Sequence, residues 1–367
     1  MKWALVALFT VHGLIHLMGP AKAFGWAELP QLAQPISRVG GVLWLGAAIG
    51  LLATAAGLGL SHRYWWVVGL AAVICSQVVI LSSWSDAKFG TVANLVLLVV
   101  VAWGFMSRGP LGLEAEYRAD VAARLADVPE TPVLRESDLA SLPEPVRRYV
   151  RTSGAVGRPI AHHVRAVWRG RIRSGPDDPW MTFSAEQWNF VSEPARFFLM
   201  RARRGGLPVD VYHAFEDGEA SMRVRLLSTF PLVDASGPEF TRAETVTILN
   251  ELALLSPSAL ASSPDIRWEP VDDHAARAHY RVGGVEVGAV LRFEDGELVD
   301  FVSDDRLAAS ADGTDFVPRR WSTPVGDYRE VDGLRLMSRG EGRWHTSSGS
   351  YAYIELELLD LEVNGGV

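Results

Sequence analysis

Four apolar stretches occupy the first part of this 367-residue chain and constrain its fold more than any other feature. They cover residues 3–18, 42–60, 65–83 and 89–105. Each holds about 16 to 19 residues, at the short end of the roughly 17 to 25 that cross a bilayer as a helix. The sequence therefore predicts a bundle of four transmembrane helices within residues 1–108.

The first stretch has a second interpretation, as a cleaved signal peptide over residues 1–23. Lys2 gives it a basic start, and Ala21-Lys22-Ala23 is similar to a cleavage site between small residues. Two histidines interrupt this stretch and three further apolar stretches follow it. Both features favour a membrane span.

An even number of spans places both ends of the membrane region on the same side. Near the predicted membrane, this side carries more basic residues than the other. The positive-inside rule then predicts that the C-terminal domain lies in the cytoplasm. The four predicted spans make membrane lipid an expected partner.

Two histidines inside the first stretch are candidate functional residues. His12 and His16 are four residues apart and share one helical face. Ionisable groups inside a span are functional candidates by default. Counting helical rise from the span ends predicts that they share one polar cluster with four further side chains. These are Gln77, Asn94, Asp86 and Lys88.

Three roles are open for this cluster. His12 and His16 can be ligands of a metal ion or a haem, although two histidines without a third protein ligand make a thin metal site. They can accept protons beside Asp86 and Lys88, which makes all four residues candidate catalytic groups. They can also hold the helices together through hydrogen bonds worth about 1 kcal/mol each.

Composition changes sharply after Met106. Up to that residue, five basic and two acidic residues give a net charge of +3, whereas the remainder carries 30 basic and 41 acidic residues, a net charge of −11. A domain with this charge repels a phosphate backbone, so the sequence predicts no nucleic-acid partner. The single cysteine, Cys75, excludes an internal disulfide and a cysteine-based zinc site.

The C-terminal part alternates between apolar and polar residues with the period of a β-strand. A charged helix is predicted at residues 114–127, a proline-rich joint at 128–133 and a short helix from Ser137. One apolar helix is predicted at residues 243–255, with Pro257 ending it. The predicted strands cover residues 162–171, 180–191, 196–203, 209–215, 221–228, 267–269, 275–282, 285–293, 297–303, 319–328, 334–345 and 351–363.

These elements predict an α+β membrane protein with three parts. A four-helix transmembrane domain at residues 1–108 is followed by a helical linker at 109–160. At residues 161–367 we expect a large curved antiparallel β half-barrel wrapped around one helix. Such a sheet usually leaves a cavity.

Seven residues of the β domain are candidate ligand contacts, because they lie on strands, beside the helix stripe or at a strand end. They are Trp188, Asn250, Glu251, Asp304, Asp305, Arg306 and Trp321. The alternatives are core packing for the tryptophans, a structural hydrogen bond for Glu251 and a surface ion pair for the Asp-Asp-Arg segment. Adjacent strand residues point to opposite faces, so Asp304 and Asp305 cannot share a pocket without a bulge.

Several segments resemble blocks of an uncharacterised bacterial membrane-protein family. They are the HGLIHL segment from His12, the WSDAKFGT segment from Trp84, the AETVTILN segment from Ala243, the FVSDDR segment from Phe301, and the WSTPV segment from Trp321 with Asp327-Tyr328. The resemblance implies a small helical membrane domain before a β-rich domain, in a bacterial inner membrane. It implies no particular reaction. Likeness of the β domain to lipoprotein carriers is an analogy of fold alone.

The sequence predicts a membrane-anchored binding protein whose half-barrel accepts an apolar small molecule such as a lipid or an isoprenoid. The motifs of serine hydrolases, phosphate-binding loops and zinc peptidases are absent from the sequence. Two alternatives are a membrane enzyme that uses His12 and His16 with a metal, a haem or a proton, and a structural interaction module.

Overall fold

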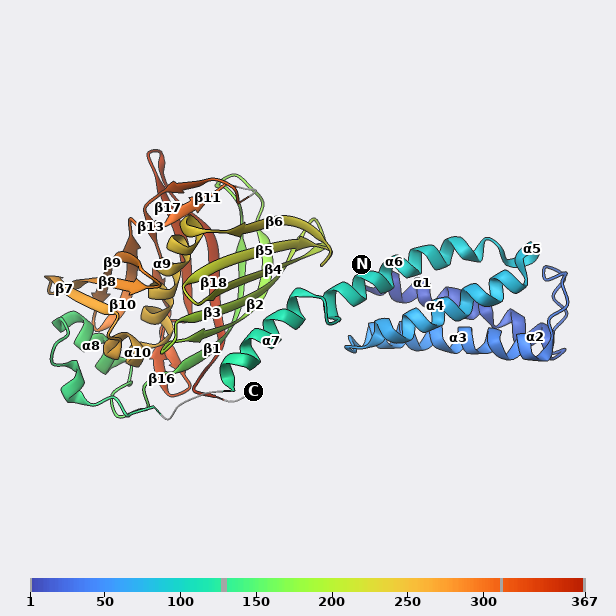
Figure 1. Ribbon diagram of the computed structural model, residues 1–367, viewed down its shortest axis with the longest axis horizontal. Coiled ribbons are helices and arrows are strands. Elements are labelled where there is room, and N and C mark those ends of the chain that lie inside the picture. The colour runs from blue at the N-terminus through green and yellow to red at the C-terminus, as the bar shows by residue number, and fades with distance from the viewer. Residues whose placement is uncertain (1, 127–130, 311–312, 366–367) are drawn as a thin grey trace. The chain divides into compact units, whose positions relative to one another are not determined.

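The computed structural model describes residues 2–126, 131–310 and 313–365, and Figure 1 shows its helices and strands. The chain forms two compact units, Met1–Glu116 and Tyr117–Val367. The residues predicted as a linker, 109–160, are divided between these units. Residue 127 of the predicted charged helix and residues 128–130 of the predicted joint lie outside the described residues.

The first unit is built from helices. They are α1 (Lys2–His16), α2 (Met18–Ala23), α3 (Arg38–Gly59), α4 (Trp65–Ser82), α5 (Trp84–Ala87) and α6 (Gly90–Arg108). By length and composition, four helical segments of the described chain can cross a membrane: Lys2–Ala23, Arg38–Gly59, Trp65–Ser82 and Gly90–Leu125. The predicted number of spans is the same.

Some predicted spans are too short. The helix predicted to start at residue 42 begins at Arg38, where the Ser37 hydroxyl accepts a hydrogen bond of 3.0 Å from the Gly40 amide and caps the helix. Backbone hydrogen bonding extends beyond the ends of an apolar run, so the run underestimates the length of the helix. Small residues let these helices approach closely, since a Cβ atom on Gly104 would lie 2.5 Å from the Trp65 ring.

The second unit is a large antiparallel sheet with helices. Its helices are α7 (Leu113–Leu125, which starts in the first unit), the 3-10 helix η1 (Glu136–Leu139), α8 (Glu144–Thr152), α9 (Pro238–Leu255) and α10 (Pro257–Ser262). Its first strands are β1 (His163–Ile172), β2 (Met181–Phe190), β3 (Ala195–Arg204), β4 (Leu207–Glu216), β5 (Glu219–Leu226), β6 (Phe230–Ser236), β7 (Ile266–Asp272), β8 (Ala275–Val282) and β9 (Val285–Glu294). The remaining strands are β10 (Glu297–Ser303), β11 (Leu307–Ala309), β12 (Phe316–Pro318), β13 (Trp321–Ser322), β14 (Val325–Gly326), β15 (Arg329–Val331), β16 (Leu334–Leu336), β17 (Arg339–Thr346) and β18 (Gly349–Val363).

The main sheet has fourteen strands in the order β6-β5-β4-β3-β2-β1-β18-β17-β13-β10-β9-β8-β7, with β14 beside β17. Its path ends at β6 and β7, which do not pair with each other among the described strands. The sheet is therefore open, as the half-barrel prediction requires. Asp217-Gly218, Gly283-Gly284 and Asp295-Gly296 have positive φ angles and form tight hairpin turns, as their composition predicts.

Several predicted strands are wrong in extent. The strand predicted at residues 319–328 is broken into β13 and β14, because Pro324 between them has no amide to donate to a neighbouring strand. The strand predicted at 334–345 is divided between β16 and β17. Strands β6, β11, β12 and β15 were not predicted; β6 is an edge strand that contains Pro231, which breaks the alternating pattern.

Helix α9 lies inside the curved sheet (Figure 1). It contacts β5 and β6 towards one end of the sheet and β9 and β10 towards the other. It begins at Pro238, five residues before the predicted start, because proline is favourable in the first helical turn. Fourteen of its 18 residues are buried, so its polar side chains are enclosed together with its apolar ones.

Candidate functional site

A cavity of about 570 Å³ lies between α9 and the inner face of the sheet. This volume is within the range of sites that enclose a small organic molecule. Much of its wall is apolar and comes from strands β3, β4, β5 and β17 and from α9. Representative residues of this apolar wall are Phe198, Met200, Val211, Met222, Phe240 and Trp344.

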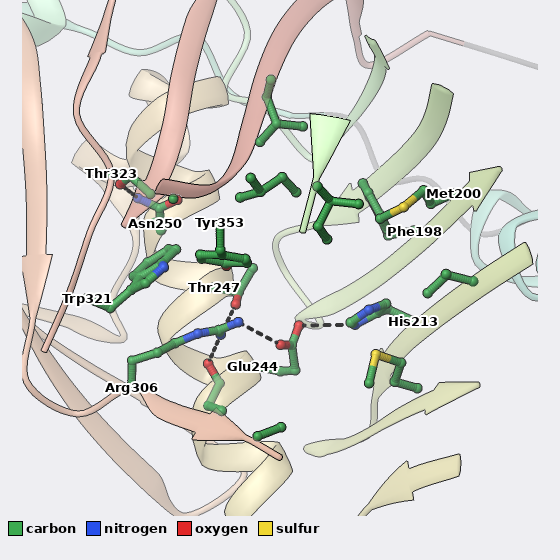
Figure 2. A pocket seen from close by; sticks show the side chains of 18 of the residues that line it. Phe198, Met200, His213, Glu244, Thr247, Asn250, Arg306, Trp321, Thr323 and Tyr353 are labelled. Atoms are coloured by element: carbon green, nitrogen blue, oxygen red, sulfur yellow. Dashed lines mark hydrogen bonds and ion pairs between the residues drawn. The ribbon is translucent and has the colours of Figure 1, made fainter. Parts of the chain in front are cut away.

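One face of α9 supplies the polar part of the cavity wall. Glu244, Thr247 and Glu251 follow one another at helical spacing and all line the cavity, and Asn250 lines it beside them. The Asn250 side-chain amide donates a hydrogen bond of 2.6 Å to the Thr323 hydroxyl. Figure 2 shows Glu244, Thr247 and Asn250 on α9, facing Arg306 and Trp321.

A continuous series of hydrogen bonds, which we call the polar chain, begins on β1 and β2. The Trp168 indole donates to Gln187 at 3.1 Å, and the Gln187 amide donates to Asn189 at 2.6 Å. The Asn189 amide then donates to the Glu251 carboxylate at 2.7 Å. These strand residues therefore hold the carboxylate of α9 in place.

The polar chain continues through two arginines. The Arg196 Nε atom lies 2.7 Å from Glu251 Oε2, and its Nη1 atom lies 3.5 Å from Glu244 Oε2. The Arg306 Nη2 atom lies 3.1 Å from Glu244 Oε1. The other terminal nitrogen of Arg306 donates to the Ala243 carbonyl and the Thr247 hydroxyl.

The Glu244 carboxylate is buried yet ionised. Burial by itself raises the pKa of Glu244, but attraction to Arg306, together with His213 and Arg196, overcomes it and holds the pKa far below its ordinary value. His213 Nδ1 lies 3.7 Å from Glu244 Oε2, and Figure 2 shows this pair at the cavity wall. Because only 5% of the Glu244 side chain is exposed, these partners replace water as its solvation.

The structure places four of the seven candidate ligand contacts in the cavity wall. These are Asn250, Glu251, Arg306 and Trp321. Glu251 also accepts hydrogen bonds from Asn189 on β2 and Arg196 on β3. The structural role that was the alternative prediction for Glu251 is therefore present as well.

Trp188, Asp304 and Asp305 do not line the cavity. Gln187 faces the cavity, so strand alternation turns Trp188 to the outer face, where its ring stacks on Phe190. Asp305 accepts hydrogen bonds from Arg242 and, at 2.7 Å, from the Gly288 amide. The Asp304 side chain is 77% exposed and lies 3.7 Å from Arg320, so the two aspartates point apart as predicted.

Sequence analysis did not single out Arg196, His213, Glu244 or Tyr353, although all four line the cavity. One signal for Glu244 was present, because a carboxylate within an apolar helical segment needs a partner when the helix is buried. No local signal marks its partners, since Arg196 and His213 resemble the other polar residues of alternating strands.

The membrane unit contains a second buried polar cluster, which brings together four of the six predicted residues. His12 Nε2 lies 3.0 Å from Asn94 Oδ1, and the Asn94 amide donates to Gln77 at 3.0 Å. His16 Nδ1 lies 2.9 Å from the His12 carbonyl oxygen. Asn94 and Gln77 lie on α6 and α4, so the cluster joins three helices.

Ser76, which was not predicted, is at the centre of this cluster. Its hydroxyl lies 2.8 Å from His16 Nε2 and 2.9 Å from Asn94 Oδ1. When a neutral His16 donates through Nδ1, its Nε2 atom is an acceptor, as is Asn94 Oδ1. The Ser76 hydroxyl has one proton, so these two acceptors share it. The short polar run Ser76-Gln77 inside an apolar stretch was the available sequence signal.

The prediction that Asp86 and Lys88 join this cluster is wrong. The Asp86 carboxylate accepts hydrogen bonds from the Gln34 amide at 2.8 Å and from Ser85 at 2.9 Å, which lower its pKa. The Lys88 ammonium lies 5.5 Å from the centre of the Phe89 ring. Both residues are in the connection between α4 and α6, where water and backbone amides are available as partners.

The described residues contain no group of three or more His, Cys, Asp or Glu side chains that could hold a metal ion. His12 Nε2 and both ring nitrogens of His16 already lie within hydrogen-bond distance of protein partners in the geometry above. Their assignment as metal or haem ligands stays a prediction.

A protein family described as a family of unknown function, DUF6544, matches residues 132–356. The chain belongs to this family. The DUF6544 region contains every residue that lines the cavity, from Trp168 to Leu356, and the helices of the membrane unit lie outside it. No curated protein matches the chain.

Two solved structures are similar to parts of this DUF6544 chain. A DUF1329 family protein from Desulfovibrio piger ATCC 29098 has 13% identity and a TM-score of 0.36, covering 61% of this chain and 93% of that one. A putative outer membrane lipoprotein-sorting protein domain from Vibrio parahaemolyticus has 10% identity and a TM-score of 0.31, covering 56% of this chain and 86% of that one. Likeness at this level says nothing about a ligand.

Proposed function

We propose that this protein is a membrane-anchored binding protein whose half-barrel accepts an apolar molecule, such as a lipid or an isoprenoid. The observation that carries the proposal is the cavity of about 570 Å³ between α9 and the sheet. Well-packed interiors leave few voids larger than a water molecule, so a space of this size is a feature to be filled.

The side chains around the cavity support an apolar occupant of variable shape. Met181, Met200, Met222 and Met337 all line it. Methionine side chains are flexible and polarisable, so they adapt to ligands that differ in outline. Aromatic rings of Phe198 and Trp344 add flat apolar surface.

The membrane unit supports a source for such a ligand. Its four apolar segments are long enough to cross a bilayer and would keep the half-barrel near the lipid phase in which apolar molecules partition. We place the protein in a bacterial inner membrane with the C-terminal domain in the cytoplasm, on the basis of the positive-inside bias.

Filling the cavity tests the proposal. Val211 lines the cavity on β4, and Val211→Trp would occupy part of it. Val271, on β7, is 50% exposed and is not part of the cavity wall, so Val271→Trp is the matched control. The full-length proteins in detergent would be titrated with the neutral dye Nile red, and molecules that co-purify would be identified by native mass spectrometry.

We expect Val211→Trp to weaken Nile red binding at least about tenfold, because the added ring overlaps the ligand volume. We expect Val271→Trp to bind as the original protein does. Equal thermal unfolding temperatures would show that both variants are folded. An original protein that neither binds the dye nor carries an apolar molecule would contradict the proposed function.

A further inference from the structure

The cavity between α9 and the sheet reaches the surface at one end of the strands. Among the described residues that line it, four are exposed: Ser174, Arg204, Leu232 and Ala309. Ser174 lies just after β1, Arg204 ends β3, Leu232 is near the start of β6, and Ala309 ends β11. These four exposed residues therefore mark the mouth of the cavity.

The pairing of the strands brings these ends together. The register from β1 to β6 places the end of β1, the end of β3 and the start of β6 at the same edge of the sheet. The loop after β11 reaches β6 as well, since a Cβ atom on Gly313 would lie 2.7 Å from the Val233 side chain. The mouth is therefore one continuous rim.

This rim carries exposed apolar side chains. Leu207, Phe230 and Leu232 are three of the seven large apolar residues that are exposed in the described part of the second unit, and Phe230 is 57% exposed. Strand alternation places Leu207 on the same face of β4 as Val209 and Val211, which line the cavity. The apolar wall of the cavity thus continues to the exposed strand ends, and a patch of this kind marks an interaction site.

Three arginines stand at the same strand ends. Arg203 and Arg204 end β3, and Arg225 lies opposite Pro231 near the end of β5. These three arginines make no ion pair within the part of the chain that the structure describes. Asp210, which lies opposite Arg225 on β4, accepts a hydrogen bond from the Ser228 hydroxyl.

Arginines elsewhere on the sheet differ from these. Arg169 and Arg171 on β1 bind Glu357 and Glu355 of β18 at 2.7 Å. The rim therefore combines positive charge that the protein leaves uncompensated with exposed apolar surface. We call this surface the lip, and it consists of Arg203, Arg204, Leu207, Arg225, Phe230 and Leu232.

The surface of a phospholipid bilayer has the chemistry that complements the lip. Guanidinium groups bind phosphate oxygens, and apolar side chains beside them enter the boundary of the acyl chains. The chain also carries four apolar segments that can cross a membrane, so a bilayer surface is a constant neighbour of this protein. Because the β domain as a whole is acidic, it can approach an anionic surface favourably where its basic groups are concentrated.

We infer that the lip docks on a bilayer that contains anionic phospholipid, and that the apolar ligand enters the mouth directly from this bilayer. Phe230 and Leu232 then lie at the acyl chains, and the arginines of the lip bind headgroup phosphates. This inference rests on the proposed function and adds the surface through which the ligand enters.

A fluorophore beside the lip tests the inference in the full-length protein. Thr229 is exposed in the turn between β5 and β6, so Thr229→Cys in a Cys75→Ser background takes a nitrobenzoxadiazole label next to Phe230. Ser192→Cys is the matched control, because Ser192 is exposed in the turn at the other end of β3. Both proteins would be placed in nanodiscs whose phosphatidylcholine carries a quenching doxyl group on its acyl chain.

The nanodiscs would contain phosphatidylcholine alone or an equimolar mixture with phosphatidylglycerol. We expect the lipid to quench the Thr229 label at least about twofold more strongly in the mixture, because anionic headgroups attract the arginines of the lip. Added salt should reduce this difference by screening the charges. The Ser192 label should respond to neither lipid.

Neutral variants separate the role of the arginines from net charge. Arg203→Gln combined with Arg225→Gln should lose most of the extra quenching. Arg267→Gln combined with Arg277→Gln removes the same charge from β7 and β8 and should keep it. None of these four arginines lines the cavity, so both double variants should bind Nile red in detergent as the original protein does.

The outcomes separate this inference from the proposed function. A Thr229 label that is quenched in neither lipid, in a protein that binds Nile red, would overturn the docking surface and leave the binding function standing. Equal quenching in the two lipids would overturn the selection of anionic phospholipid. Blue-shifted emission without quenching would show that protein covers the lip, which also overturns the inference. Loss of Nile red binding in the original protein counts against the proposed function, whatever the label reports.

Discussion

At the scale of single residues, Asp300 is a half-buried carboxylate that does not line the cavity. It lies on β10, and its Oδ1 atom has no hydrogen-bond partner among the described residues. Burial raises the pKa of Asp300 to about 6 from an ordinary value of 3.8, although the Phe301 amide and Arg292 oppose the rise. The folded protein therefore binds a proton at Asp300 more tightly than the unfolded chain does.

This shift predicts the sign of a pH effect on stability. As the pH rises from about 4 to about 6, the unfolded chain ionises Asp300 before the folded protein does, so the free energy of unfolding falls. We expect Asp300→Asn to be more stable than the original protein by about 1–2 kcal/mol at pH 7.5, after allowance for partial exposure. The gain should disappear near pH 4.

Urea unfolding of the full-length protein in detergent, followed by tryptophan fluorescence at pH 4 and pH 7.5, measures this effect. Asp304→Asn is the control, because the Asp304 side chain is 77% exposed and its replacement should change stability by less than about 0.5 kcal/mol. A less stable Asp300→Asn protein at pH 7.5 would show that the carboxylate makes a favourable interaction there.

At the scale of elements, two hairpin turns from distant parts of the sheet meet. Gly218 is in the turn between β4 and β5, and Gly283 is in the turn between β8 and β9. A Cβ atom built on Gly283 would lie only 2.8 Å from the Gly218 Cα atom. The sheet therefore curves around α9 until these turns touch, although its edge strands do not pair.

This contact predicts different effects for two neighbouring glycines. Gly283 and Gly284 both have positive φ angles, of 57° and 82°, so alanine is strained at either position. A Cβ atom on Gly284 has nothing within 4 Å, whereas one on Gly283 meets backbone. We expect Gly284→Ala to lower the free energy of unfolding by about 1 kcal/mol and Gly283→Ala by about 2–3 kcal/mol.

Unfolding of the two variants in parallel, under the conditions used for Asp300→Asn, gives the difference directly. Equal losses in the two variants would mean that the turns do not restrict each other in solution. The half-barrel would then be held by α9 alone at that end.

At the scale of the whole molecule, the proposed orientation can be tested with one cysteine at a time. Cys75 is the single native cysteine, so Cys75→Ser provides a cysteine-free background. Gln31→Cys would place a thiol between α2 and α3, and Ser348→Cys would place one at the exposed turn between β17 and β18. With the C-terminal domain in the cytoplasm, a membrane-impermeant maleimide should label only the first in intact spheroplasts.

Permeabilised spheroplasts provide the control, because both positions should then react. Labelling of Ser348→Cys but not of Gln31→Cys in intact spheroplasts would reverse the orientation. The ligand would then reach the half-barrel from the opposite face of the membrane.

The sequence by itself determined the large features of this protein. Four apolar runs specified the candidate spans, and a period of two specified the long strands, because both patterns arise from local geometry and the solvent that each side chain faces. Glycine and aspartate specified the hairpin turns for the same local reason. His12, Gln77 and Asn94 could be placed together because depth along a straight helix can be counted from its ends.

Only the tertiary structure decided which polar residues meet. Arg196, Glu244 and Arg306 come from β3, α9 and the residues after β10, and the curvature of the sheet brings them into one network around the cavity. The same folding sends Trp188 to the outer face and brings the Arg306 guanidinium carbon to 5.0 Å from the centre of the Trp321 ring. Burial and pairing depend on contacts between residues far apart in the chain, and local pattern does not contain that information.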